Sequence, residues 1–467
     1  MKQMDFKSKA EYIGDYDVIV VGGGPSGTAA SIAASRNGAK TLIIESTGCM
    51  GGNATSGGLP FWLGAKSQGR EVVAGIYKEL TDLMIAEKMT IGPGRSPSQG
   101  GKMKGMGITD DEVMFDLEGG KRAHENLAIK SGVLISYFTT AIMPKVKNKK
   151  IEGLYIHNKS GLGYVGAKVV IDCSGDADIA FDGGFETTKG DGPDKSLCPI
   201  TLIWHAENVN VDELSAYLIN GGDKRFRAVV EDAKTKGIWP WASDIIIMFP
   251  MMKDGVMMIN GQSQINVDGT NAAEITKAMI DGRKYAAEYL EVLKRYIPGY
   301  KNAALRYVAS SLGVRETRRI KAEYMLTTED IVNGVEFDDV VALSGYHFDL
   351  GKPVKQADGS WLLVQPLHKN VNAGQSQPLQ KAAKGYIEIP YRCLIPKGSV
   401  NLLVAGRCVG VEGQALGPIR VMAPCFAMGE AVGTAAAMSI NENCSVQKIS
   451  ITALKEKLTS QGAIVKI

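Results

Sequence analysis

The sequence predicts an α/β fold built around a parallel β-sheet, and three features near its start predict it. An apolar run at 18–21 has the composition of a buried strand, and the small residues at 28–37 are typical of a packed helix. A second apolar run at 41–44 ends at Glu45, which completes a strand–helix–strand unit. The first strand and the helix are joined by a G-x-G-x-x-G pattern formed by Gly22, Gly24 and Gly27. These parts in this order predict a dinucleotide-binding site.

Each glycine of this turn has its own physical reason. Gly22 permits the tight turn, Gly24 lets backbone N–H groups approach a pyrophosphate, and Gly27 lets helix and strand pack closely. Glu45 lies 23 residues after the first glycine, where a carboxylate accepts hydrogen bonds from ribose hydroxyls. The same turn and strand end supply three further candidate contacts, Pro25, Ser26 and Ser46.

The composition is that of a globular protein with more than one domain. The chain has 467 residues, 45% of them hydrophobic and 22% charged, too many for one ordinary core. A net charge of +3 argues against nucleic acid or a membrane surface as a partner. The N-terminus lacks the apolar core of a signal peptide, and the stretch 421–440 is typical of a buried helix. The seven cysteines include no C-x-x-C pair, which indicates reduced thiols, and we expect a cytoplasmic protein.

A second G-x-G-x-x-G, at 161–166, does not predict a second nucleotide site. A strand is expected on each side of it, at 151–158 and 167–172, and no helix comes after it. Two strands joined by a glycine turn form a hairpin. We therefore expect one pyrophosphate-binding turn and no built-in nicotinamide site.

The pattern changes in the middle of the chain and returns near its end. A long amphipathic helix is expected at 272–296. A strand at 401–405 and a helix at 418–440 then repeat the nucleotide-binding pattern. The breaker-rich stretch 91–107 is expected to be a loop, either on the surface or as a mobile lid over an active site.

Five segments of the chain, in this order, resemble the FAD-dependent oxidoreductases of the glutathione-reductase-like superfamily. They are DVIVVGGGPSGTAASIAASRNGAKTLIIE, GCMGGNATSGG, AKVVIDCSGDADIA, RETRRIKAEYMLTTEDI and the C-terminal stretch from IPYRCLIP to VGTAAA. The second segment is similar to the flavin loop of fumarate-reductase-like flavoproteins. The resemblance implies a Rossmann-like FAD/NAD(P)-binding domain, with a parallel sheet, helices and an added β-meander, and an inserted α+β substrate domain.

The resemblance also implies a division of the chain. The FAD-binding domain would be discontinuous, formed by residues 1–60, 110–200 and 391–467. Residues 61–109 would form a helix and the glycine-rich, lid-like loop. Residues 201–390 would form the substrate, or cap, domain.

The resemblance further implies which residues contact FAD. A loop rich in Gly, Asn and Thr offers hydrogen bonds to the polar edges of a flavin ring. The C-terminal helix would point its positive N-terminal end at the flavin N1/O2 edge, where Arg420 would add a charge or pair with Glu412 or Glu430. Without a histidine in the loop, the FAD is expected to be non-covalent. The implied contacts are Gly52, Asn53, Ala54, Thr55, the backbone of Ile142, Ser174, Gly175, Gly406, Arg407, Arg420, Val421 and Met422.

The candidates for catalysis are fewer, because the flavin carries the redox step. Of Arg315, Arg318 and Arg319, two are expected in salt bridges on a helix face, and we choose Arg319 as the one that binds a carboxylate substrate. Arg392 either binds an anion or acts as an acid, or it forms an ion pair between domains. His347 is either a titrating catalytic group or a buried structural imidazole. No two of the five histidines are spaced to share a metal, so no metal site is expected.

We therefore expect an FAD-dependent oxidoreductase that transfers a hydride between flavin N5 and a small organic substrate in the cleft between domains. A flavin monooxygenase or halogenase is the alternative among redox enzymes, although the halogenase pattern GWxWxIP is absent. A non-catalytic FAD sensor or an RNA-modifying flavoprotein is the alternative outside them, and the near-neutral charge counts against RNA. The electron donor or acceptor and the oligomeric state stay unassigned.

Overall fold

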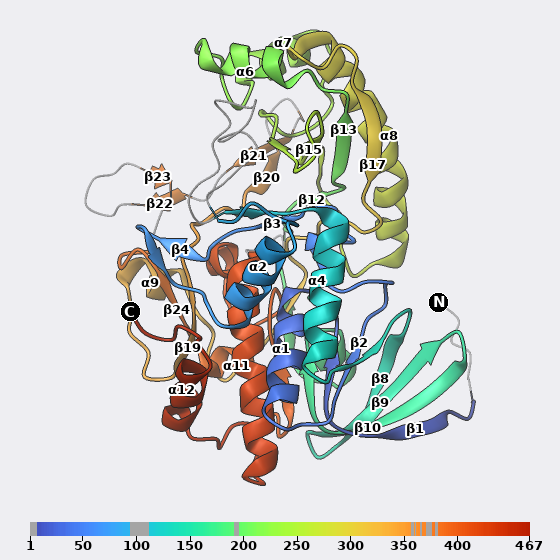
Figure 1. The fold of residues 1–467 in the computed structure, drawn as a ribbon, viewed down its shortest axis with the longest axis vertical. Helices are drawn as coiled ribbons and strands as arrows, with labels where there is room; N and C mark the ends of the chain where they lie inside the picture. Colours follow the sequence, from blue (N-terminus) through green and yellow to red (C-terminus); the bar gives the residue numbers. More distant parts are fainter. Residues whose placement is uncertain are drawn as a thin grey trace.

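The structure is a computed structural model that describes most of the chain (Figure 1). The described residues are 7–93, 112–190, 196–355, 359, 361–364, 367–369, 376–378 and 382–467. Most of the glycine-rich stretch 91–107 lies outside them, so neither interpretation of that loop is addressed. The described chain forms a larger body, which contains both ends of the sequence, and a second lobe made from its middle.

The larger body is built on a seven-stranded sheet with the order β7-β2-β1-β10-β9-β8, in which β25 also pairs with β10. The strands are β1 (Glu11–Val21), β2 (Thr41–Ile44), β7 (Leu134–Ser136), β8 (Thr140–Lys147), β9 (Lys150–Asn158), β10 (Gly161–Asp172) and β25 (Leu402–Val404). β7, β2, β1, β10 and β25 pair in parallel, whereas β10, β9 and β8 pair in antiparallel order. The expected α/β fold with an added β-meander is confirmed.

The second glycine pattern lies in a hairpin, as its flanking strands predict. β9 and β10 pair with Gly161 opposite Asn158 and Gly166 opposite Gly153. The pattern continues into the rest of β10 and not into a helix, so its backbone N–H groups belong to a sheet ladder instead of an anion site. The single pyrophosphate-binding turn expected from the sequence is the one after β1.

Two helices of the larger body, α1 (Pro25–Arg36) and α11 (Met422–Asn441), pack directly on each other (Figure 1). A Cβ atom at Gly429 would overlap the carbonyl oxygen of Ser26, and one at Gly433 would overlap that of Ala30. Because the two contacts come in the same order along both helices, the helices run parallel. These pairings place the first residue of α11 six residues before the first residue of α1 along their shared direction, which is about 9 Å at a rise of ~1.5 Å per residue.

The helix expected at 418–440 is broken in the structure. A short helix α10 (Leu416–Ile419) precedes α11, and the combined segment bends by 91° between Ile419 and Met422. Among the described residues no single helix is long and apolar enough to cross a membrane, and this bent pair passes only when its two parts are counted together. Most residues of α11 are buried within the fold.

The remaining elements of the larger body surround these two helices and the sheet. The helices are α2 (Ile76–Ala86), α4 (Leu117–Lys130), α5 (Asp178–Asp182), α9 (Thr328–Asn333) and α12 (Ile451–Ser460). The short strand pairs are β3 (Phe61–Trp62) with β6 (Val113–Met114), β4 (Lys66–Ser67) with β5 (Arg70–Glu71), β11 (Thr187–Lys189) with β18 (Arg318–Ile320), and β19 (Val340–Ser344) with β24 (Ile387–Pro390).

The second lobe has its own sheet and its own core. Its four-stranded sheet has the order β14-β15-β13-β17, and α6, α7 and α8 complete the lobe (Figure 1). The bounds are β13 (Trp204–Glu207), β14 (Met248–Pro250), β15 (Met257–Ile259), β17 (Ala304–Val308), α6 (Val211–Ile219), α7 (Arg227–Thr235) and α8 (Ala272–Tyr296). Buried residues within 200–314 form two apolar clusters separate from the main core, whereas residues after 320 pack into the main core. The residues at which the expected domains begin and end stay a prediction.

Three further strand pairs complete the described chain. They are β12 (Ile200–Thr201) with β16 (Ser263–Gln264), β20 (Lys352–Lys355) with β21 (Trp361–Val364), and β22 (Leu367–Lys369) with β23 (Ser376–Pro378).

Candidate functional site

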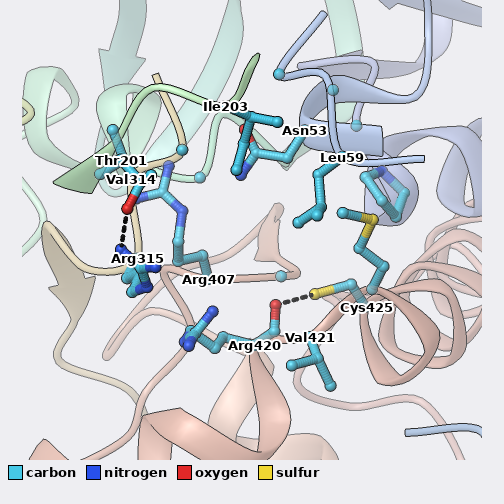
Figure 2. A pocket seen from close by; sticks show the side chains of 18 of the residues that line it. Asn53, Leu59, Thr201, Ile203, Val314, Arg315, Arg407, Arg420, Val421 and Cys425 are labelled. Carbon is cyan, nitrogen blue, oxygen red and sulfur yellow. Dashed lines mark hydrogen bonds between the residues drawn. The ribbon is translucent and has the colours of Figure 1, made fainter. Parts of the chain in front are cut away.

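A cavity of about 960 Å³ runs from the first glycine turn into the second lobe. It is lined by the turn after β1, the end of β2, the loop at 52–59 and the segment after β10. Further lining comes from the second lobe and from the N-terminus of α11. The cavity is therefore shared by both parts of the fold, as Figure 2 shows for part of its wall.

The three glycines of the first turn divide into two that pack and one that faces open space. Gly22 has φ +97°, and a Cβ there would overlap the carbonyl oxygen of Cys173. A Cβ at Gly27 would overlap the carbonyl oxygen of Gly22, so this glycine allows α1 to approach β1. Gly24 lines the cavity, and a Cβ there would meet nothing within 4 Å. Space beside Gly24 is what close approach of a pyrophosphate requires.

Glu45 lies at the end of β2 with its carboxylate fixed beside the turn. Its Oε2 accepts a hydrogen bond from the Gly23 backbone N–H at 2.6 Å, and its Oε1 accepts one from the Thr47 N–H at 2.7 Å. Glu45 and Ser46 both line the cavity. A carboxylate with remaining lone pairs at this position can accept hydrogen bonds from ribose hydroxyls.

Two helix N-termini open onto the same cavity. α1 begins with Pro25 after Gly24, α11 begins with Met422 after Val421, and no side chain caps either helix. All four of these residues and Ser26 line the cavity. Uncapped N-termini carry a partial positive charge, which stabilises anionic groups, although in α11 the Ala423 N–H already donates to the Leu63 carbonyl at 3.2 Å and Pro424 has no N–H. Because the two helices are offset along their axes, their N-terminal partial charges lie at two separate points of the cavity wall, which suits an extended ligand.

The loop at 52–55 presents one side to the cavity and buries the other. Gly52 and Asn53 line the cavity, whereas Ala54 and Thr55 do not. The Thr55 hydroxyl donates a hydrogen bond to the Met50 carbonyl at 2.6 Å, which holds the loop in shape. A Cβ at Gly52 would lie 3.0 Å from Cα of Gly24, so the loop packs tightly against the glycine turn.

The segment after β10 meets the segment after β25 at the cavity wall. Ser174, Gly175, Gly406 and Arg407 all line it. Gly175 has φ +81°, and a Cβ there would lie 2.7 Å from Nη2 of Arg407. Arg407 forms an ion pair with Asp176, at 3.0 Å between Nη1 and Oδ1. The guanidinium is thus held against the wall beside the turn.

Ile142 lies on β8 with 41% of its surface exposed, and it does not line the cavity. Three residues immediately before it do, namely Thr139, Thr140 and Ala141. Ile142 follows them in β8, and the expected contact of its backbone with FAD stays a prediction.

Two of the three candidate catalytic residues lie away from the cavity. Arg392 pairs with Asp339, at 2.9 Å between Nε and Oδ2, and half of its side chain is exposed. Arg319 is buried and pairs with Glu316, at 2.7 Å between Nη1 and Oε1. His347 does line the cavity and lies against the Tyr346 ring, with 4.2 Å between ring centroids, and it is exposed, so it is not a buried structural imidazole.

The arginine that reaches the cavity is Arg315, which the sequence did not single out. Arg318 and Arg319 sit in β18, a strand and not the expected helix face, and each pairs with an acid: Arg318 with Asp178 and Arg319 with Glu316. Two of the three arginines are therefore in ion pairs as expected, but the third is Arg315. The sequence carried no signal for this choice, because the acidic partner of Arg318 is 140 residues away.

Arg420 lines the cavity and pairs with an acid that the sequence did not suggest. Its Nη2 lies 3.0 Å from both carboxylate oxygens of Asp349, and Glu412 and Glu430 are not its partners. Although burial lowers it, the Asp349 carboxylate raises the pKa of Arg420 overall. Burial and then Asp349 raise the pKa of Tyr346 on the same wall. Asp349 lies two residues after His347, and no sequence pattern marked it as the partner of Arg420.

The described residues contain no group of three His, Cys, Asp or Glu that could hold a metal ion. The seven cysteines are free, and six of them are buried. The residues that are present fit a flavin dinucleotide. Gly24 faces open space, Glu45 and two uncapped helix N-termini line the same cavity, and Nε of Arg420 is buried without a partner among the described residues.

Several solved structures similar to this chain are enzymes with low sequence identity to it. A geranylgeranyl bacteriochlorophyll reductase-like protein from Thermoplasma acidophilum is 14% identical, with 97% of this chain and 84% of that chain covered and a TM-score of 0.46. The p-nitrophenol 4-monooxygenase of Pseudomonas putida is 11% identical, with 93% and 82% covered and a TM-score of 0.45. A flavin-dependent brominase is 13% identical, with 96% and 83% covered and a TM-score of 0.44.

The comparison with protein families covers nearly the whole chain. The family model described as FAD dependent oxidoreductase matches residues 17–458, from the start of the first strand–helix–strand unit into α12. This match includes the whole second lobe and the cavity-lining segments of the larger body, from the turn after β1 to the N-terminus of α11. The chain belongs to the FAD-dependent oxidoreductase family.

Proposed function

We propose that this FAD-dependent oxidoreductase binds FAD non-covalently and transfers a hydride between the flavin and a small organic substrate held in the same cavity. The observation that carries the proposal is the continuity of that cavity. It extends from Gly24 and Glu45, which suit the adenosine and pyrophosphate, to Arg315 and Tyr346, which lie beyond the N-terminus of α11. One continuous space suits a cofactor with a substrate beside it.

The residues of the chain divide the work along this cavity. Glu45 would bind the ribose, and the N-terminus of α1 would bind the pyrophosphate. The N-terminus of α11 and Arg420 would stabilise negative charge at the flavin N1/O2 edge. When bound, FAD supplies the hydride chemistry at N5. The second lobe would close the cavity on the substrate side and exclude water.

The test is to purify the protein and record its spectrum before and after denaturation. We expect a yellow protein whose FAD is released into solution by heat or acid. The bound flavin should then be reduced anaerobically by a member of a panel of hydroxy acids, amines, steroids and reduced nicotinamides. A colourless protein that gains no FAD on incubation contradicts the proposal, and flavin that stays with the precipitated chain contradicts the non-covalent attachment.

The same experiment separates this function from its rivals. Uncoupled peroxide formation or oxygen insertion under turnover would assign the protein to monooxygenase or halogenase chemistry. A flavin that is reduced without repeated turnover of any metabolite would indicate a sensor.

A further inference from the structure

The cavity wall contributed by the second lobe holds a guanidinium with no acidic partner among the described residues. Nη1 of Arg315 donates hydrogen bonds to the Pro199 carbonyl at 2.7 Å and to the Thr201 hydroxyl at 2.9 Å. Nη2 has one long contact of 3.4 Å with Oδ1 of Asn260. All of these acceptors are neutral, and in the part of the chain that the structure describes no carboxylate lies within ion-pair distance of Arg315. Among the described residues the guanidinium is therefore held by neutral acceptors and forms no ion pair.

Asp349, the acid that acts electrostatically on Arg315, is already used by a neighbour. Both carboxylate oxygens of Asp349 lie 3.0 Å from Nη2 of Arg420, so that pair is complete. Asp244, the other acid on the second-lobe side of the cavity lining, is exposed. Burial and then the nearby Arg420 lower the pKa of Arg315, and these two effects outweigh the opposing effect of Asp349. An uncompensated, partly buried guanidinium is costly unless an anion joins it.

The geometry of the free edge selects the kind of anion. With Nη1 held by Pro199 and Thr201, the edge formed by Nε and Nη2 of Arg315 is the one left for a ligand. That edge presents two parallel N–H groups, which match the two oxygens of a carboxylate. Thr201 and Val314 flank Arg315 at the cavity, and Arg420 approaches the same space from another element (Figure 2).

The same wall carries a group of apolar side chains, although polar and charged residues line it too, including the exposed Arg225 and Arg227. Four side chains, Ile203, Ile245, Ile247 and Phe249, line the cavity on the same lobe. Apolar side chains beside a partly buried, fixed guanidinium suit a ligand with a hydrocarbon body and an acidic group.

We propose that the substrate is an organic carboxylic acid, whose carboxylate pairs with Arg315 while its apolar body lies against the wall of the second lobe. The role of this acid as a substrate rests on the proposed function, whereas its binding at Arg315 does not depend on the flavin. It assigns Arg315 the role that the sequence suggested for Arg319. Arg319 is committed to Glu316 and does not reach the cavity.

The test is calorimetric titration of the purified protein with benzoate and with its neutral counterpart benzamide, with the flavin content of each sample measured separately. We expect saturable binding of benzoate and at least about tenfold weaker binding of benzamide. Arg315→Met should weaken benzoate binding about tenfold or more, and Arg315→Lys should weaken it less. The matched control is Arg306→Met, which removes an exposed arginine that pairs with Glu207 away from the cavity lining and should bind benzoate as the unchanged protein does.

Each outcome bears on one proposal at a time. Equal binding of benzoate and benzamide, or full benzoate binding by Arg315→Met, would overturn the anion site even if the protein is fully loaded with FAD. Benzoate binding by a protein that takes up no FAD would leave the anion site standing and remove the proposed oxidoreductase function. If an arginine variant keeps the flavin content and melting temperature of the unchanged protein, misfolding is excluded as the cause of lost binding. If Arg315→Met does not fold, benzoate binding by Arg315→Lys decides the case.

Discussion

Replacing Gly24 with alanine separates cofactor binding from folding. The backbone of Gly24 has φ −64° and ψ −174°, which alanine adopts without strain, and a Cβ there meets no protein atom within 4 Å. A glycine replaced by alanine at such a position usually stabilises a protein by ~0.4–1 kcal/mol, because the unfolded chain loses freedom. We therefore expect the apo form of Gly24→Ala to be at least as stable as the unchanged protein.

The same methyl group projects toward the space that we assign to the pyrophosphate. Overpacking a tight contact costs ~1–3 kcal/mol, which corresponds to a loss of FAD affinity of about fivefold to 150-fold. Gly27→Ala is the contrasting variant, because its Cβ would overlap the Gly22 carbonyl oxygen inside the protein. It should lower the stability of the apo form by at least ~1 kcal/mol, whatever its effect on FAD.

The assay is urea unfolding of the apo proteins together with fluorescence titration of FAD. The expected pattern is unchanged or higher stability with weaker FAD binding for Gly24→Ala, and lower stability for Gly27→Ala. If Gly24→Ala binds FAD as tightly as the unchanged protein, the cofactor does not approach this glycine and the assignment of the turn is refuted. A large loss of stability in Gly24→Ala would refute the geometric reasoning instead.

Buried and surface groups give three further predictions. Burial raises the pKa of Glu430 to about 7, so the unchanged protein should lose stability relative to Glu430→Gln as the pH rises from about 4.5 to 7, by about 3 kcal/mol in total. Urea unfolding of both proteins at pH 5 and pH 8 measures this loss. Stabilities that change with pH in the same way in the two proteins would contradict the prediction. Gly429→Ala should destabilise the fold by ~1–3 kcal/mol, because its Cβ would overlap the Ser26 carbonyl oxygen of α1. A melting temperature equal to that of the unchanged protein would disprove that packing. Arg392→Ala should cost no more than ~1 kcal/mol, because the pair with Asp339 is half-exposed, and should leave FAD content unaltered; loss of FAD or of anaerobic flavin reduction in that variant would restore Arg392 as a candidate for the site.

Much of the fold could be predicted from local sequence, because the features that specify it are local. The apolar run before Gly22, the three glycines and the run that ends at Glu45 lie within a single strand–helix–strand unit, so their spacing predicts both structure and cofactor class. The hairpin at 161–166 was also predicted correctly, because the element that comes after a glycine pattern, helix or strand, decides the role of its backbone N–H groups. The break at Arg420 within the expected C-terminal helix was not predicted, because apolar residues flank it on both sides, with Ile419 before it and Val421 and Met422 after it.

By itself, the sequence predicted the glycine turn and the strand–helix–strand unit at one end of the cavity, because local backbone conformation and glycine positions specify them. Only the tertiary structure decided the other end. Arg315, Arg318 and Arg319 are chemically alike and lie within five residues, so no local pattern separates the one that faces the cavity from the two in ion pairs. The partners that decide the matter, such as Asp178 for Arg318, come from distant parts of the chain. A charge is neutralised by whatever the fold brings beside it, and that arrangement is set by long-range packing.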